Sequence, residues 1–346
     1  MASILDDFEK YISEGYLIAV MPITRLMVDF EAISFPHGVT FYPASYIELN
    51  DLGYVASRQY GQDVSVAELV SAVSGVTLED FDEHPLVVFP CTFNWDEFRA
   101  DNFRNHLKFI TTLSQYVDET LDVVRYYQCE INNFHPLPGK AGTLNSNIMM
   151  SAALLYNPKI KEARIIAGDA FATRITRGLG LPLERVEPNL FPKSGEVGKI
   201  VRHAFSLYSN IMESDNLTVK FTQCMSLIEF LAFPDEYKKF SDVSKIISRY
   251  VAKNAKDYQE LLERFNDLTG RKDPETNELL GLRTRIIHLG EKLEAIIRDD
   301  AVIKMLFLEL QIYIKSAINH MIEHSELSWD DYLELRNQLT PFTAKG

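Results

Sequence analysis

The pattern of apolar and polar positions divides the chain into two parts. In residues 1–190, short alternating or β-branched and aromatic segments predict strands, while apolar residues at three- and four-residue spacing predict helices. The predicted strands are Tyr16–Pro22, Leu26–Phe35, Val39–Glu48 and Pro85–Phe93, and the predicted helices are Ser3–Ser13, Val64–Val73 and Trp95–Tyr127. Turn residues at Pro22 and Pro36-His37-Gly38 favour an antiparallel meander of the first three strands. Residues 1–190 are therefore predicted to form a mixed α/β domain of the α+β class, with 142–188 left open between helix and strand.

The remainder of the chain has a helical pattern throughout. It follows the segment Pro188–Gly195, whose Pro, Gly and Ser residues are typical of a linker. The predicted helices are Val197–Met212, Leu217–Phe233, Val243–Ala252, Asp257–Leu268, Leu279–Ile297, Ala301–His324 and Trp329–Leu339, the last with Ser328 as its N-cap. Residues 196–340 are therefore predicted to form an all-α bundle.

Composition narrows the class of protein. Hydrophobic residues make up 46% and charged residues 24% of the 346-residue chain, which is typical of globular domains. No apolar run is long enough for a membrane span, and the N-terminus lacks the features of a secretory signal. Three scattered cysteines, Cys91, Cys129 and Cys224, form no metal-binding or disulfide pattern. We expect a soluble, cytoplasmic protein without membrane contact.

The charge is unevenly distributed. The formal net charge is −14, of which residues 1–200 contribute −10 (16 Lys and Arg against 26 Asp and Glu). Such an acidic part is a poor surface for nucleic acid. Residues 238–272 carry nine basic residues against five acidic ones, and this stretch is either a guide for a polyanion or an ordinary solvated helix face.

Several common catalytic motifs are missing from the sequence. It contains no P-loop, no HExxH and no GxSxG, and Gly178-Leu-Gly180 lacks the third glycine of a dinucleotide fingerprint. His320 and His324 have a spacing that can hold a metal, but no third ligand lies nearby in sequence, which favours surface histidines. We expect no cofactor and no metal.

One string in the helical part combines residues suited to RNA cleavage. Leu282–Gly290 contains Arg283 and His288 with four residues between them. Histidine titrates near neutrality and can move protons, while arginine is a permanent cation that can stabilise charge on a phosphorane. Arg285 lies on nearly the same helical face as His288 and is a candidate second phosphate contact, or an ordinary surface arginine.

This string resembles the RxxxxH motif of HEPN domains, and most closely that of the ApeA-like HEPN group. Thr284 stands where serine is common, and Leu289-Gly290 replaces the closing glycines. The upstream segment Phe221–Leu231 is similar to the early helix of the family. Within it Glu229 could orient a motif residue, although the pattern favours a cap or surface carboxylate. The resemblance covers about residues 200–325.

The resemblance implies a metal-independent endoribonuclease that works as a homodimer. Its RNA substrate, for which tRNA is one candidate, would be cleaved to a 2′,3′-cyclic phosphate and a 5′-hydroxyl by Arg283 and His288. On an ideal helix these two side chains project about 140° apart, so motifs from two protomers would share one cleft. It also implies a role in bacterial antiphage defence, with residues 1–190 as a sensor of a protein or phage-derived trigger.

Two alternatives remain open at this stage. The spacing alone is weak evidence, because Arg99 and His106, with six residues between them, give a second match, which we set aside because it lies in the acidic mixed α/β part. Inactive HEPN-like domains act as dimerisation and protein-interaction modules, in which the Arg/His pair would only order the end of a bundle. A metal-dependent hydrolase in the first part would need a carboxylate and histidine cluster that no spacing reveals.

Overall fold

The chain consists of two compact units. A computed structural model describes residues 3–52, 76, 78–100, 106–131, 137–144, 150–169, 180–273, 275–276, 278 and 280–339. Residues 1–124 and 135–188 form the N-terminal unit, and residues 125–134 and 189–346 form the helical unit. The predicted helix Val64–Val73 lies outside the described residues.

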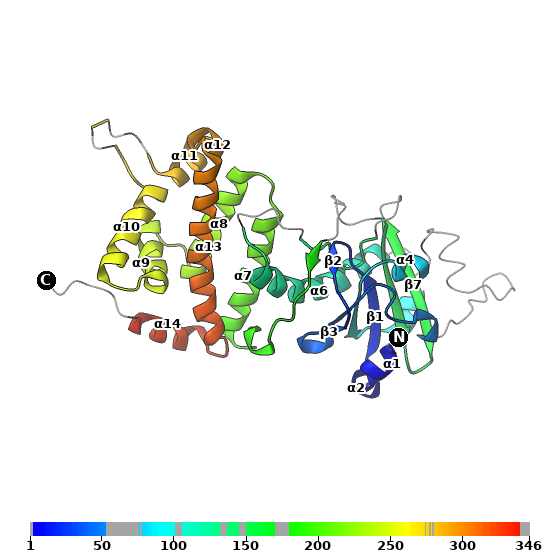
Figure 1. Ribbon diagram of the computed structural model, residues 1–346. Helices are drawn as coiled ribbons and strands as arrows, with labels where there is room; N and C mark the ends of the chain where they lie inside the picture. Colours follow the sequence, from blue (N-terminus) through cyan, green and yellow to red (C-terminus); the bar gives the residue numbers. More distant parts are fainter. Residues whose placement is uncertain are drawn as a thin grey trace. The chain divides into compact units, whose positions relative to one another are not determined.

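An antiparallel six-stranded sheet forms the centre of the N-terminal unit (Figure 1). Its strand order is β3-β4-β5-β1-β6-β7. The strands are β1 (Leu17–Pro22), β3 (Ile33–Ser34), β4 (Thr40–Tyr42), β5 (Leu86–Cys91), β6 (Met150–Asn157) and β7 (Glu162–Asp169). The segment 142–188 therefore supplies a hairpin, in which Leu154 pairs with Ile165.

The predicted meander is wrong in its pairing. The central strand β1 pairs with β5 and β6, whereas β2 (Leu26–Met27) pairs in parallel with β8 (Leu181–Pro182) in a separate two-stranded sheet. All six residues of β1 are buried, as expected for an inner strand whose two faces are both covered. The turn at Pro36–Gly38 was correctly predicted, because it joins β3 to β4.

Helices and apolar side chains cover both faces of this sheet. On one face, Ile18, Val88 and Leu154 belong to a buried cluster with Phe8 and with Phe81 of α4 (Leu78–Asp82). Phe8 lies between α1 (Ile4–Asp7) and α2 (Glu9–Ser13), which together replace the single predicted helix. On the other face, the Phe89 ring stacks at 5.3 Å on Tyr116 of α6 (His106–Gln128), which follows α5 (Trp95–Ala100).

The second unit is helical, as the sequence predicts. Its helices are α7 (Glu196–Glu213), α8 (Leu217–Ala232), α9 (Phe240–Val251), α10 (Ala255–Thr269), α11 (Leu282–Leu289), α12 (Leu293–Ile296), α13 (Asp300–Glu323) and α14 (Trp329–Gln338). Helix α13 packs against α7, α8 and α9 (Figure 1). Ser328 accepts a hydrogen bond from the Asp331 amide and is the N-cap of α14. The end of α6 belongs to this unit, where the Tyr126 hydroxyl donates to Asn319 Oδ1 at 2.7 Å.

Arg336 fixes α14 to the end of α8. Its side chain is buried, Nη1 donates to the Ala232 carbonyl at 2.6 Å, and the guanidinium lies over the rings of Phe233 and Trp329. We expect Arg336→Ala to lower the free energy of unfolding by about 3 kcal/mol, because a charged buried hydrogen bond and two cation–π contacts are lost. Urea unfolding measures this. Arg202→Ala is the control, since Arg202 also donates to backbone carbonyls but is only partly buried, and an equal loss in both variants would contradict the prediction.

His320 is expected to make the helical unit sensitive to acid. Burial lowers the pKa of His320, the neighbouring His324 lowers it further, and Glu323 opposes both. The folded state therefore favours the neutral ring, which approaches the Tyr332 hydroxyl at 2.9 Å. A histidine whose pKa is lowered by folding stabilises the folded state above the pKa of the unfolded chain, about 6.5. This stabilisation is lost as the pH falls below that value. We expect Tm to fall between pH 7.5 and pH 5 by less in His320→Asn than in the wild type. Equal falls in both proteins would exclude His320 as the cause.

A candidate active site on helix α11

Two glycines and a threonine fix the position of α11. Gly281 precedes the helix, and a Cβ there would approach the Thr269 backbone carbon to 2.5 Å, so a close backbone approach requires glycine. The Thr284 hydroxyl donates to the Thr269 carbonyl at the end of α10. Gly290 ends the helix with a left-handed φ of 70°, which explains why the predicted helix 279–297 is divided into α11 and α12.

Arg283 is held by groups from two other helices. Its Nη2 lies 2.7 Å from Glu229 Oε1 of α8, and its guanidinium carbon lies 5.6 Å from the centre of the Phe240 ring at the start of α9. About a quarter of the side chain, 26%, stays exposed. Burial raises the pKa of Glu229, and the positive charge of Arg283 counteracts part of that rise. The favoured interpretation of Glu229 as a cap or surface carboxylate was wrong, since it orients Arg283 across the bundle.

Arg285 is engaged at the other end of the helix. Its Nε donates to Glu291 Oε1 at 2.9 Å, and its Nη2 donates to Glu291 Oε2, so both sides of the carboxylate are bound. The Glu291 amide also donates to the Arg285 carbonyl. The pair is partly exposed, which makes it a modest contribution to stability. A phosphate would have to share or displace Glu291 to bind Arg285.

His288 is an exposed side chain in the last turn of α11. Among the described residues it has no hydrogen-bond or ion-pair partner. The structure does not join it to Arg283 by any described contact, although both residues stand on the same short helix. Two further exposed residues, Ile287 and Leu289, flank it. His288 is thus free to meet a substrate or another protein.

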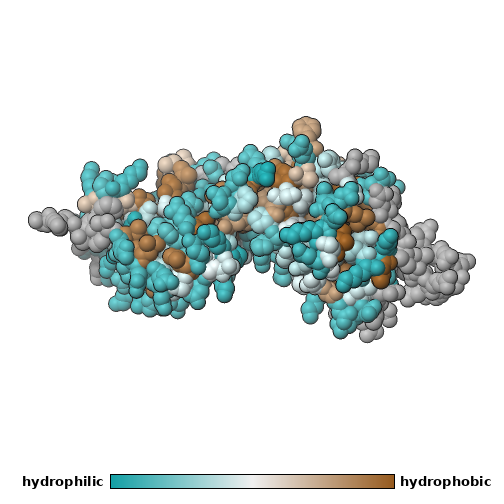
Figure 2. Space-filling view, turned by 90° about the horizontal axis from the view of Figure 1, so that it is seen from below, coloured by the Kyte–Doolittle hydropathy of each residue, from teal (hydrophilic) through white to brown (hydrophobic). Residues whose placement is uncertain are grey.

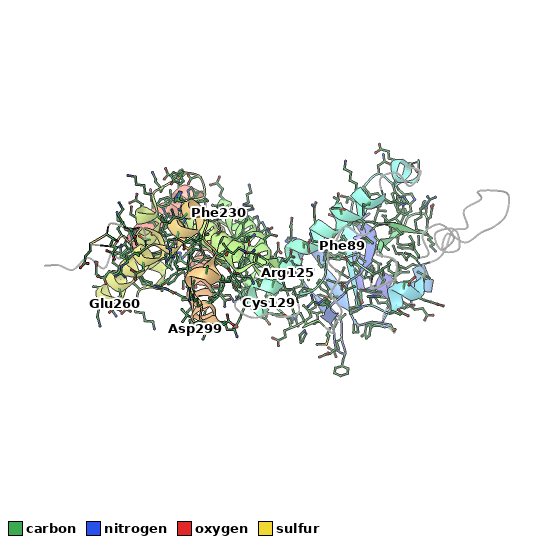
Figure 3. The ribbon with its side chains drawn as sticks, turned by 90° about the horizontal axis from the view of Figure 1, so that it is seen from above. Phe89, Arg125, Cys129, Phe230, Glu260 and Asp299 are labelled. Carbon is green, nitrogen blue, oxygen red and sulfur yellow. The ribbon has the colours of Figure 1, made fainter. Side chains whose placement is uncertain are left out.

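A pocket lies beside the Arg283–Glu229 pair. Its volume is about 370 Å³, and it is lined by the last turns of α8, the loop 234–238 and the beginning of α9. Glu229 is one wall, and Phe230, labelled in Figure 3, is another. The sequence did not predict this pocket. The available signal was Tyr237, an aromatic residue in a polar loop that is 85% exposed in the structure.

The basic stretch 238–272 contributes less positive charge than its composition indicates. Five of its nine basic residues form ion pairs with acidic neighbours: Lys238 with Glu236, Lys245 with Asp242, Lys256 with Glu260, Arg264 with Glu309 and Arg271 with Asp267. Pairs of this kind offset the field that a polyanion would meet. The stretch is closer to a solvated helix face than to a continuous basic cleft.

Other candidate residues do not gather into a second site. The rings of His320 and His324 lie 5.0 Å apart and pack on Tyr332. In the part of the chain that the structure describes, no group of three His, Cys, Asp or Glu residues is placed to hold a metal. In the second Arg/His match, His106 is buried, and the side chain of Arg99 lies outside the part of the chain that the structure describes. No described helix is long and apolar enough to cross a membrane.

Comparison with models of known protein families, with curated proteins and with solved structures gives no match.

Proposed function

We propose that the helical unit is a metal-independent endoribonuclease of the HEPN class, with Arg283 and His288 as catalytic residues and Arg285 as a substrate contact. The observation that carries the proposal is the state of the two motif side chains. Arg283 is oriented by Glu229 and Phe240 but still partly exposed, and His288 is exposed and unpartnered among the described residues. An oriented cation and a free imidazole are what RNA cleavage requires.

The chemistry uses the nucleophile that RNA carries. The ribose 2′-hydroxyl attacks the adjacent phosphorus, its proton passes to a base, and the 5′-oxygen leaves with a proton from an acid. An imidazole can accept a proton and can also donate one, so His288 could serve as the base or as the acid. Arg283 stabilises the negative charge that builds on the nonbridging oxygens. The products are a 2′,3′-cyclic phosphate and a 5′-hydroxyl, with no metal involved.

A homodimer completes this proposed site. Arg283 and His288 diverge on one helix, so a cleft between two copies of α11 would bring the arginine of one protomer to the histidine of the other. The N-terminal unit, which carries the greater share of negative charge, would sense a protein or phage-derived trigger and restrain the nuclease. The expected setting is antiphage defence.

The test is cleavage of total RNA and of tRNA by the full-length protein in the presence of EDTA. We expect fragments that end in 2′,3′-cyclic phosphate and 5′-hydroxyl, and no fragments from the double variant Arg283→Ala/His288→Ala purified in the same way. Fragments with 3′-hydroxyl ends, or equal cleavage by both proteins, would refute the proposal.

The second candidate is a non-catalytic dimerisation and protein-interaction module. The ion pairs of Arg283 with Glu229 and of Arg285 with Glu291 favour it, because both arginines already have carboxylate partners within their own chain. This function predicts a stable dimer by sedimentation and no cleavage of any RNA. In this alternative the exposed Ile287, His288 and Leu289 would contact the partner protein.

A further inference from the structure

The pocket beside Arg283 combines stacking surfaces with hydrogen-bond acceptors. Its lining includes the aromatic residues Phe230, Phe233 and Tyr237 and the carboxylates of Glu229, Asp235 and Glu236. Its volume, about 370 Å³, falls in the range of small-ligand sites. Aromatic faces of this kind stack on nucleobases regardless of base identity, whereas acceptors select bases that carry N–H donors.

The charges around the pocket favour a ligand whose buried part is neutral and carries N–H donors. Glu229 is paired with Arg283, and Glu236 is paired with Lys238 at 2.8 Å. Asp235 is the carboxylate of the lining that has no hydrogen bond or ion pair among the described residues. Both nearby cations are therefore offset by their carboxylate partners, and Asp235 remains as an acceptor. A neutral base stacked on the aromatic residues would offer N–H donors to Asp235, while the phosphate of the nucleotide stays outside this acidic lining.

We propose that this pocket binds the base of a guanine nucleotide, stacked on Tyr237, with its N1–H and 2-amino group donating to Asp235. A single carboxylate accepts both guanine donors side by side. Uracil offers one N–H between two carbonyl oxygens, which a carboxylate repels, so it is the disfavoured base. Tyr237 is 85% exposed, so a base can reach its ring without displacing packed side chains.

The role of the pocket in RNA cleavage rests on the proposed function. In that setting the nucleotide whose 2′-hydroxyl attacks would place its base in the pocket and its 3′-phosphate at Arg283. Tyr237 and Asp235 would then be specificity-determining residues, and cleavage would follow guanosine. Binding of a free nucleotide needs no cleavage and can be measured separately.

The experiment is titration of the full-length protein with 3′-GMP and with 3′-UMP, followed by calorimetry. We expect 3′-GMP to bind at least about fivefold more tightly than 3′-UMP, and Tyr237→Ala and Asp235→Asn each to weaken 3′-GMP binding by at least about fivefold, as loss of one stack or one bidentate contact implies. Asp29→Asn and Phe30→Ala are matched controls, because this exposed acidic and aromatic pair lies in the other unit. Both should bind as the wild type does.

The outcomes separate this inference from the proposed function. Equal affinity for both nucleotides, no binding of either, or unchanged binding in Tyr237→Ala and Asp235→Asn would overturn the guanine pocket, even in a protein that cleaves RNA. Selective 3′-GMP binding without any RNA cleavage would support the pocket and count against the nuclease. In an active protein, sequencing of the cleavage ends should show guanosine on the 5′ side of the cut, and this preference should weaken in Asp235→Asn.

Discussion

His288→Ala is expected to reduce metal-independent RNA cleavage by about 10²- to 10⁴-fold, the range that a general acid or base contributes. In the proposed mechanism, the substitution removes the group that moves protons at the 2′- and 5′-oxygens. Because His288 is exposed and has no described partner, the free energy of unfolding should change by less than about 0.5 kcal/mol. Initial rates on tRNA with EDTA present, together with thermal unfolding, measure both quantities.

The matched control for this variant is His37→Asn. His37 is also exposed but lies in the N-terminal unit, at a φ of 63° that asparagine tolerates. It should cleave at the wild-type rate. A His288→Ala protein that is folded, dimeric and as active as His37→Asn would remove His288 from the mechanism and would favour the interaction module.

The helical elements could be predicted from the sequence because their signals are local. Apolar spacing located α7, α8 and α13. The N-cap Ser328 could also be predicted, because it binds the amide of Asp331 only three residues further on. Strand pairing in the N-terminal unit depends instead on segments far apart in the chain. The partners of β1, which are β5 and β6, begin about 70 and 130 residues further on. The turn residues next to β1 therefore predicted pairing with the following segment, which is not its neighbour in the sheet.

The site could be predicted only in part for the same reason. The spacing of Arg283 and His288 is visible in the sequence, but the groups that orient the arginine come from other helices. Glu229 precedes Arg283 by 54 residues, and no local pattern joins the two. The sequence also presents Arg285 as a free cation for a phosphate contact, but in the structure Glu291 offsets its positive charge. The pocket depends on how the loop 234–238 folds against α8, which spacing does not encode.

Arg283→Lys separates a catalytic arginine from a structural one. Lysine keeps a positive charge opposite Glu229, so the ion pair across the bundle survives, but the planar fork of donors is lost. If Arg283 stabilises the phosphorane, cleavage should fall by about 10²- to 10³-fold, as it does when a preorganised donor is removed. If Arg283 only orders the bundle, lysine should substitute well and activity should change little.

Arg264→Lys is the control that isolates the role of position 283. Arg264 makes a similar pair in the same unit, with Nε and Nη2 donating to Glu309 at 2.8 Å, and it lies on α10. Both variants lose a guanidinium fork and keep a cation, so their unfolding free energies should fall by comparable amounts, about 1 kcal/mol or less for such partly exposed pairs. Only Arg283→Lys should lose cleavage. Equal activity in the two variants would assign Arg283 to the architecture of the bundle.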